Sequence, residues 1–187
     1  CTLTAVPDAG YTFDGWYSDA EYDHLLSNEE TFEFVPAGPL RHIYPVFMPG
    51  EIQLDALNTA NCYIAPELLR DYSFDATVQG NGCATLNITP QRLSGAYARL
   101  VWETGTQANS VISSLGYDGS RIRFRTGTQQ GNALIGLFNA GGECVWSWHI
   151  WVANYDPESS SQKYSSGDIF MDRNLGTVGT DYTKVTA

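Results

Sequence analysis

The sequence has little positive charge, and this shortage argues against two classes of partner. Its 187 residues carry 10 Lys and Arg against 21 Asp and Glu, which gives a formal net charge of -11 and a pI near 4.4. Nucleic acids and anionic membrane surfaces are bound through clustered Lys and Arg side chains. We therefore expect neither nucleic acid nor an anionic membrane surface as a partner.

Long apolar runs are also missing. A helix that crosses a bilayer needs about 20 predominantly apolar residues, and no run in this chain approaches that length. No basic and apolar stretch opens the chain, so we expect any export signal to have been removed already or to lie outside this sequence.

The common catalytic and metal motifs are absent. The chain has only three histidines, His24, His42 and His149, and none belongs to an H-E-x-x-H spacing. There is no G-x-S-x-G serine motif and no phosphate-binding G-x-x-x-x-G-K-[ST] loop. The acidic residues 19–23 lack the glycine-punctuated pattern of a calcium loop, so a solvated loop is favoured. The sequence predicts a protein without metal or cofactor and without enzymatic activity.

Cysteine is scarce, and its spacing disfavours zinc. The four cysteines form no C-x-x-C pair, and three full disulfide pairings stay open. Cys144 lies on the apolar face of a predicted strand, which favours a buried free thiol. Cys1 is compatible with the lipidated first residue of an exported outer-membrane lipoprotein, although a β-like stretch begins directly after it.

Aromatic residues, at 13%, and 18 glycines are plentiful and indicate many short strands joined by tight turns. The most prominent stretch is 144–152, which holds three of the five tryptophans. Alternation places Trp146 and Trp148 on one face, and His149 and Trp151 on the other. We predict that this stretch is a core strand, because each buried aromatic side chain removes about 150–250 Å² from water.

Residues 1–49 form the first predicted unit. The segments 2–6 and 11–17 alternate around turn residues and predict a hairpin. An acidic loop over 18–30 and strands over 31–35 and 42–47 follow, and Pro45 favours an edge position for the last strand. Pro49 and Gly50 end the unit, and 50–60 is interpreted as a linker.

The first unit resembles a known family. The run Gly10-Tyr11-Thr12-Phe13-Asp14-Gly15-Trp16-Tyr17, with its flanking strands, is similar to the internalin-type B repeat of bacterial surface proteins. The resemblance implies a small β-rich spacer or binding module outside the cell, and it transfers no catalytic residue.

Residues 61–187 form the second predicted unit, an antiparallel two-sheet β-sandwich. Glycine-containing turns at 80–82, 118–119 and 139–142 can adopt the positive φ that tight hairpins need. We expect a continuous antiparallel meander over residues 110–152. The candidate strands cover 62–65, 72–78, 84–89, 98–103, 110–117, 121–126, 133–138, 144–152 and 169–173.

Residues 57–176 carry a second resemblance. The runs Asn61-Cys62-Tyr63-Ile64, Trp146-Ser147-Trp148-His149-Ile150-Trp151 and Met171-Asp172-Arg173-Asn174-Leu175-Gly176 are similar to the β-domain that precedes Fibrobacter-type major paralogous domains. This resemblance implies export by a gut-dwelling bacterium and the start of a further, truncated domain near 169–187 of the second unit. It implies no reaction.

The candidate ligand-binding residues are Arg121, Arg123, Arg125, His149 and Trp151. The three arginines alternate along one strand, where they either pair with neighbouring acids or bind an acidic sugar. His149 and Trp151 share a face that either stacks on a sugar or is covered by another part of the chain.

The leading hypothesis is a noncatalytic bacterial cell-surface module that is adhesive or glycan-binding, with a glycan, a host or cell-surface protein and neighbouring domains as partners. The alternatives are an accessory region of a larger carbohydrate-active enzyme and a purely structural spacer.

Overall fold

The computed structural model of the protein describes residues 1–8, 10–35, 42–84, 87 and 89–179. It is almost entirely β, which confirms the predicted fold class. The chain forms two units, Cys1–Ile52 and Gln53–Ala187, which we call the N-terminal unit and the sandwich unit.

The N-terminal unit contains a two-stranded sheet, β1-β4, and a three-stranded sheet, β3-β2-β5. The predicted hairpin between the first two strands is wrong. Both edges of β2 are occupied, by β3 and β5, and β1 instead pairs with β4 so that Leu3 lies opposite Phe32. The strands are β1 (Thr2–Thr4), β2 (Tyr11–Tyr17), β3 (Leu25–Ser27), β4 (Thr31–Glu33) and β5 (Tyr44–Pro49).

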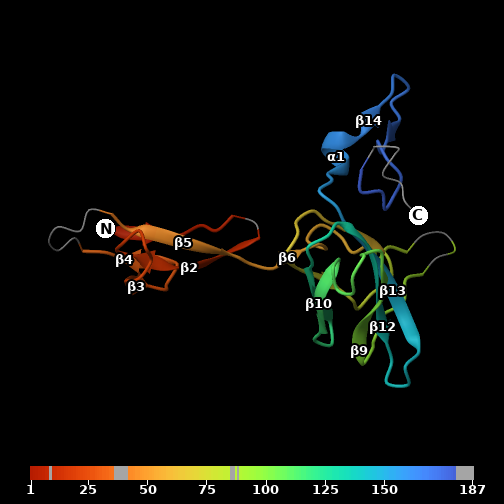
Figure 1. Cartoon of the computed structure of the whole chain (residues 1–187), viewed down its shortest axis with the longest axis horizontal. Coiled ribbons are helices and arrows are strands. Elements are labelled where there is room, and N and C mark those ends of the chain that lie inside the picture. Colours follow the sequence, from red (N-terminus) through yellow and green to blue (C-terminus); the bar gives the residue numbers. More distant parts are fainter. Residues whose placement is uncertain (9, 36–41, 85–86, 88, 180–187) are drawn as a thin grey trace. The chain divides into compact units, whose positions relative to one another are not determined.

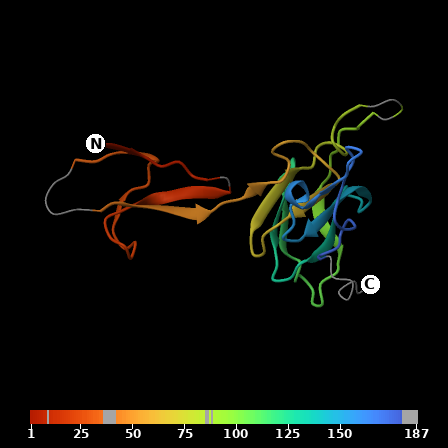
Figure 2. The ribbon, with the colours of Figure 1, turned by 90° about the horizontal axis from the view of Figure 1, so that it is seen from above.

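The three-stranded sheet contains most of the aromatic side chains described in this unit. Figure 2 shows β2 in red beside β5 in orange, and the Phe13 ring lies 5.3 Å from Trp16 and 5.7 Å from Phe47. β5 is an edge strand, as Pro45 predicts. The segment predicted as a loop contains β3, because Ser27 pairs with Trp16.

The sandwich unit consists mainly of two four-stranded sheets, ordered β10-β11-β8-β6 and β7-β13-β12-β9 (Figure 1). Short elements follow them: α1, which Asp156 caps by accepting a hydrogen bond from the Glu158 amide, and the pair β14-β15. The elements are β6 (Ile52–Gln53), β7 (Cys62–Ala65), β8 (Asp71–Asp75), β9 (Tyr97–Glu103), β10 (Ile112–Tyr117), β11 (Arg121–Thr126), β12 (Gly131–Phe138), β13 (Cys144–Val152), α1 (Pro157–Ser160), β14 (Gln162–Lys163) and β15 (Ile169–Phe170).

The continuous meander predicted over 110–152 is wrong, because the chain changes sheets in the middle of it. β11 pairs with β10 and β8, whereas β12 pairs with β9 and β13. At the crossing, Gly127 approaches Ser110 so closely that a Cβ would lie 2.1 Å from the Ser110 carbonyl oxygen. Among the described strands, β7 and β13 run parallel and so depart from the predicted antiparallel pattern.

Two of the three predicted hairpin turns are confirmed, whereas no described strand begins directly after the turn at 80–82. Gly119 joins β10 to β11 with φ of 99°, and Gly142 joins β12 to β13 with φ of 84°. The strand predicted over 84–89 includes residues 85, 86 and 88, which lie outside the described residues. Asn87 within it has φ of 75° and forms a turn.

The core lies between the two four-stranded sheets. Phe74 from one sheet has its ring 5.0 Å from Tyr63 and 5.2 Å from Trp148 of the other, and all three side chains are buried. Cys144 is exposed, which corrects the prediction of a buried thiol. A register shift opposite Phe138 separates it from the core-facing part of β13.

Candidate functional site

The three candidate arginines extend along β11, and each is paired with an aspartate. Alternation buries Ile122 and Phe124 in the core and leaves the arginines on the other face. Ion pairs join Arg121 to Asp55, Arg123 to Asp118 and Arg125 to Asp71. The positive charge of the ladder is therefore compensated within the chain, which matches the first of the two interpretations of this pattern.

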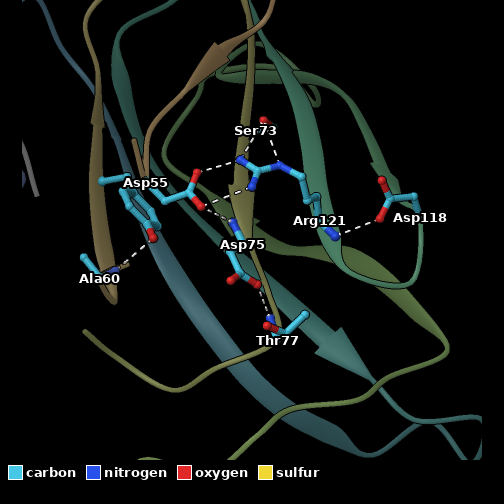
Figure 3. Close-up of polar contacts among 8 residues, drawn as sticks. Asp55, Ala60, Ser73, Asp75, Thr77, Asp118 and Arg121 are labelled. Carbon is cyan, nitrogen blue, oxygen red and sulfur yellow. Dashed lines mark hydrogen bonds and ion pairs between the residues drawn. The ribbon is translucent and has the colours of Figure 1, made fainter. Parts of the chain in front are cut away.

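The Arg121 pair is the most enclosed of the three. The Nη2 and Nη1 atoms of Arg121 lie 2.6 and 3.2 Å from the two carboxylate oxygens of Asp55, and Nη2 also donates to Ser73 Oγ at 3.1 Å (Figure 3). Burial raises the pKa of Asp55, but hydrogen bonds from Arg121 and from the Asp75 amide outweigh it and lower that pKa. Asp55 comes from the segment predicted as a linker, so that part of the segment is held against the sandwich.

The Arg123 pair closes the β10–β11 turn. The Asp118 carboxylate accepts hydrogen bonds from the amides of Arg121 and Ser120 and from the Arg123 side chain. The Arg121 amide, then the Arg123 guanidinium, hold the pKa of Asp118 well below its usual range. This arrangement stabilises a turn, and a ligand carboxylate at Arg123 would have to displace it.

Trp151 is fully buried, so it presents no ring face to a sugar. Its ring lies 5.0 Å from that of Tyr155, and the Arg173 guanidinium lies over the Tyr155 ring at 4.2 Å from its centroid. Arg173 is held in turn by Asp172 at 2.8 Å. The segment after β13 therefore covers this face, and Trp151 is a packing residue.

His149 belongs to a chain of hydrogen bonds that spans three strands. Its Nδ1 lies 3.1 Å from Cys62 Sγ, its Nε2 lies 2.8 Å from Asn132 Oδ1, and Asn132 Nδ2 donates to the Gly176 carbonyl at 2.8 Å. Because the Asn132 amide nitrogen donates to Gly176, its oxygen faces His149. His149 then carries its proton on Nε2 and accepts from the Cys62 thiol.

This Cys–His–Asn arrangement has the connectivity of a nucleophile, a base and an orienting group. Burial raises the pKa of the Cys62 thiol and lowers the pKa of His149. Both groups are therefore neutral near pH 7, whereas reactive cysteines have a lowered pKa. The chain of bonds connects β7, β13 and β12 to the segment around Gly176, which is a structural role.

A pocket of about 390 Å³ lies beside Trp146, within the usual range of about 300–1,000 Å³ for ligand sites. Asn61 and Trp146 approach it from the start of β7 and from β13, and the loop after β8 completes it. Trp146 is half-buried, and its indole Nε1 donates to Asn61 Oδ1 at 2.9 Å. The lining residues are Ala60, Asn61, Gln79, Gly80, Asn81, Cys83, Pro90 and Trp146.

Sequence reasoning missed this pocket because its residues are scattered from 60 to 146. The run Gly80-Asn81-Gly82 was recognisable only as a turn, and Gly80 and Gly82 do have positive φ of 57° and 67°. Trp146 was assigned correctly to the core-facing side of its strand, but the sandwich does not cover it completely.

The acidic residues 19–23 of the N-terminal unit form a turn. The Asp19 carboxylate accepts hydrogen bonds from the amides of Asp23 and His24 and contacts the His24 ring at 3.1 Å. The pKa of Asp19 is lowered, chiefly by the hydrogen bond that its carboxylate accepts from the Asp23 backbone amide. Across the described part of the chain, no three His, Cys, Asp or Glu side chains group as metal ligands.

Comparison with known proteins identifies the first part of the chain only. Residues 1–39 match the family model of the divergent InlB B-repeat domain, which confirms the repeat part of the sequence resemblance. No curated protein and no solved structure gives a significant match. The resemblance of residues 57–176 to the Fibrobacter-associated β-domain stays a prediction.

The B-repeat match is consistent with a noncatalytic, surface-associated module, because this domain family is typical of bacterial surface proteins and suggests an extracellular location. Within the described residues, no helix is long and apolar enough to cross a membrane.

Proposed function

We propose that the protein is a noncatalytic bacterial cell-surface module whose sandwich unit binds a glycan in the pocket beside Trp146. The observation that carries the proposal is the combination of a half-buried indole with three side-chain amides, those of Asn61, Gln79 and Asn81. Sugars combine an apolar ring face with a rim of hydroxyl groups, so an aromatic ring and amide groups in one pocket suit both parts.

The charge of the chain favours this pocket over the arginine ladder as the ligand site. Arg121 and Arg125 have ion-pair distances of 2.6 Å to their aspartates, so an acidic sugar would have to compete with an existing carboxylate. The lining of the pocket contains no Lys, Arg, Asp or Glu among the residues that the structure describes. A neutral glycan can bind there without breaking an ion pair.

A glycan array with the full chain and three variants tests the proposal. Trp146→Ala should abolish binding, because it removes the aromatic wall of the pocket. Trp102→Ala should preserve it, because Trp102 is 45% exposed on β9 and does not line the pocket. Arg123→Ala should also preserve it.

Other outcomes favour the alternatives. Loss of binding in Arg123→Ala with retention in Trp146→Ala would assign the ligand to the arginine ladder. Failure of the wild-type chain to bind any glycan would overturn the proposal and favour a structural spacer. Fusion of the chain to a glycosidase in its gene would favour the accessory region of an enzyme.

A further inference from the structure

We infer that the pocket beside Trp146 selects a neutral N-acetylated sugar, because its side chains offer hydrogen-bond donors in excess of acceptors. This inference rests on the proposed glycan-binding function and deepens it. It follows from the way in which backbone amides orient the three side-chain amides.

Each of these amides uses its oxygen within the protein. Gln79 Oε1 accepts from the Gln91 amide at 3.1 Å, and Asn81 Oδ1 accepts from the Cys83 amide at 3.0 Å. Asn61 Oδ1 accepts twice, from Trp146 Nε1 at 2.9 Å and from the Gly80 amide at 3.1 Å. Because a backbone N–H can only donate, these contacts define which end of each amide is the oxygen.

The NH₂ groups of the same side chains are left as donors. In the part of the chain that the structure describes, Asn61 Nδ2, Gln79 Nε2 and Asn81 Nδ2 have no protein partner. The indole N–H of Trp146 is already used by Asn61, so Trp146 contributes only its apolar surface. A ligand that satisfies this pocket must therefore bring strong acceptors and an apolar group.

An acetamido group meets both requirements. Its carbonyl oxygen has two lone pairs and accepts from amide NH₂ groups, and its methyl can pack against Trp146, Ala60 and Pro90. A carboxylate also accepts, but it would enter a pocket without a lining cation in a chain of net charge -11. A hydroxyl group also needs an acceptor for its own proton, and among the lining amides only the Gln79 and Asn81 oxygens, with one lone pair each, can still accept.

Titration calorimetry with the full chain and three matched trisaccharides tests the preference. The probes are an N-acetylglucosamine trisaccharide, its fully de-N-acetylated form and the glucose trisaccharide with the same linkage. Loss of the acetamido contacts should raise the Kd at least about tenfold, which corresponds to about 1.4 kcal/mol of binding free energy. A glucuronic acid oligosaccharide should bind more weakly than the N-acetylated probe.

Two isosteric variants test the donors themselves. Asn81→Asp and Gln79→Glu keep the oxygen that accepts from the backbone and replace only the NH₂ group, so the loop retains its hydrogen bonds. Each should weaken binding of the N-acetylated trisaccharide at least about tenfold, because an acceptor then faces an acceptor. Asn109→Asp adds the same charge on the exposed β9–β10 connection and should leave binding unchanged.

Cys83 supplies a second readout that does not depend on a variant. It is exposed and lines the pocket, so bound trisaccharide should slow its alkylation, as measured by peptide mass spectrometry, without slowing that of Cys144.

The two levels of the proposal fail separately. If no glycan binds or protects Cys83, the glycan-binding function is wrong. If glycans bind beside Trp146 with equal affinity for all neutral probes, or if Asn81→Asp and Gln79→Glu bind like wild type, only the N-acetyl preference is wrong.

Discussion

Both units of this protein are rich in aromatic residues, but they bury these side chains to different extents. The N-terminal unit is rich in aromatic side chains, yet Ala5 and Trp16 are the only buried hydrophobic residues among its described positions. In the sandwich unit, two sheets face each other and fully bury Phe74 and Trp148, and the segment after β13 buries Trp151 on the opposite face of its strand. The difference shows that aromatic content alone does not make a core, because an apolar face must be covered by a second layer.

The comparison extends to polar groups. Most side-chain hydrogen bonds described in the N-terminal unit are exposed, such as those that the Asp19 carboxylate accepts from the amides of Asp23 and His24. The sandwich unit encloses its Arg121–Asp55 pair, whose side chains are 23% and 10% exposed. We therefore expect the sandwich unit to unfold at a higher urea concentration than the N-terminal unit, and peptide-resolved hydrogen exchange in urea follows both in one chain.

The largest expected effect comes from the covered tryptophans. Trp148→Ala and Trp151→Ala should each destabilise the sandwich unit by about 3–5 kcal/mol, the usual cost of truncating a large buried aromatic. Trp102→Ala, at an exposed position, should change stability by about 0.5 kcal/mol or less. Hydrogen exchange in urea should show that β2 and β5 keep their protection in all three variants. A small loss in Trp151→Ala would mean that the segment after β13 does not cover it.

Replacing an arginine with alanine should destabilise the sandwich unit more where its ion pair is enclosed than where the pair is exposed. Arg121→Ala removes the partner of a largely buried Asp55 and should cost about 1–3 kcal/mol, because a desolvated carboxylate loses its compensating donors. Arg125→Ala should cost less than about 1 kcal/mol, since both side chains of that pair are more than two-fifths exposed. Urea denaturation of the two variants measures the difference, and equal losses would show that enclosure does not matter here.

His149 should make the stability of the sandwich unit depend on pH. Burial lowers the folded pKa of His149 below 6.5, so the unfolded chain binds this proton more readily. The contribution of His149 is then complete above about pH 6.5 and is lost as pH falls through the lower folded pKa. His149→Gln should flatten this part of the profile of unfolding free energy against pH. Parallel profiles for the two proteins would disprove the coupling.

The smallest expected effect is confined to the N-terminal unit. Asp19→Ala removes the acceptor for the amides of Asp23 and His24 and should increase hydrogen exchange at those amides. The strands of the sandwich unit should keep their protection. Increased exchange in β12 or β13 would mean that the two units do not unfold independently.

Local patterns predicted the elements with the clearest alternation or turn chemistry. β7, β11 and β13 have the predicted ends, and Gly119 and Gly142 adopt the predicted positive φ. Strand pairing was less predictable, because each strand has two edges and alternation does not identify the partner. The β1–β4 pair and the change of sheet at Gly127 were missed for this reason.

The candidate sites show the same limit. Alternation placed Arg121, Arg123 and Arg125 on one face of β11, but their aspartate partners come from positions 55, 71 and 118. It also placed His149 and Trp151 on one face, yet could not show that Tyr155 covers that face. Asp55 and Asp71 lie more than fifty positions from Arg121 and Arg125, so no local pattern identifies these two ion pairs.

The sequence by itself determined the all-β class, the acidic character and the B-repeat resemblance of the first residues, because composition, alternation and local motifs are properties of neighbouring residues. Only the tertiary structure decided which aromatic faces are covered, which charges are paired and where Trp146 meets Asn61, Gln79 and Asn81. The physical reason is that burial and long-range hydrogen bonds depend on which segments, distant in the sequence, pack against each other in the fold. On β13, the facing sheet covers Trp148, whereas Trp146 lies beside a pocket.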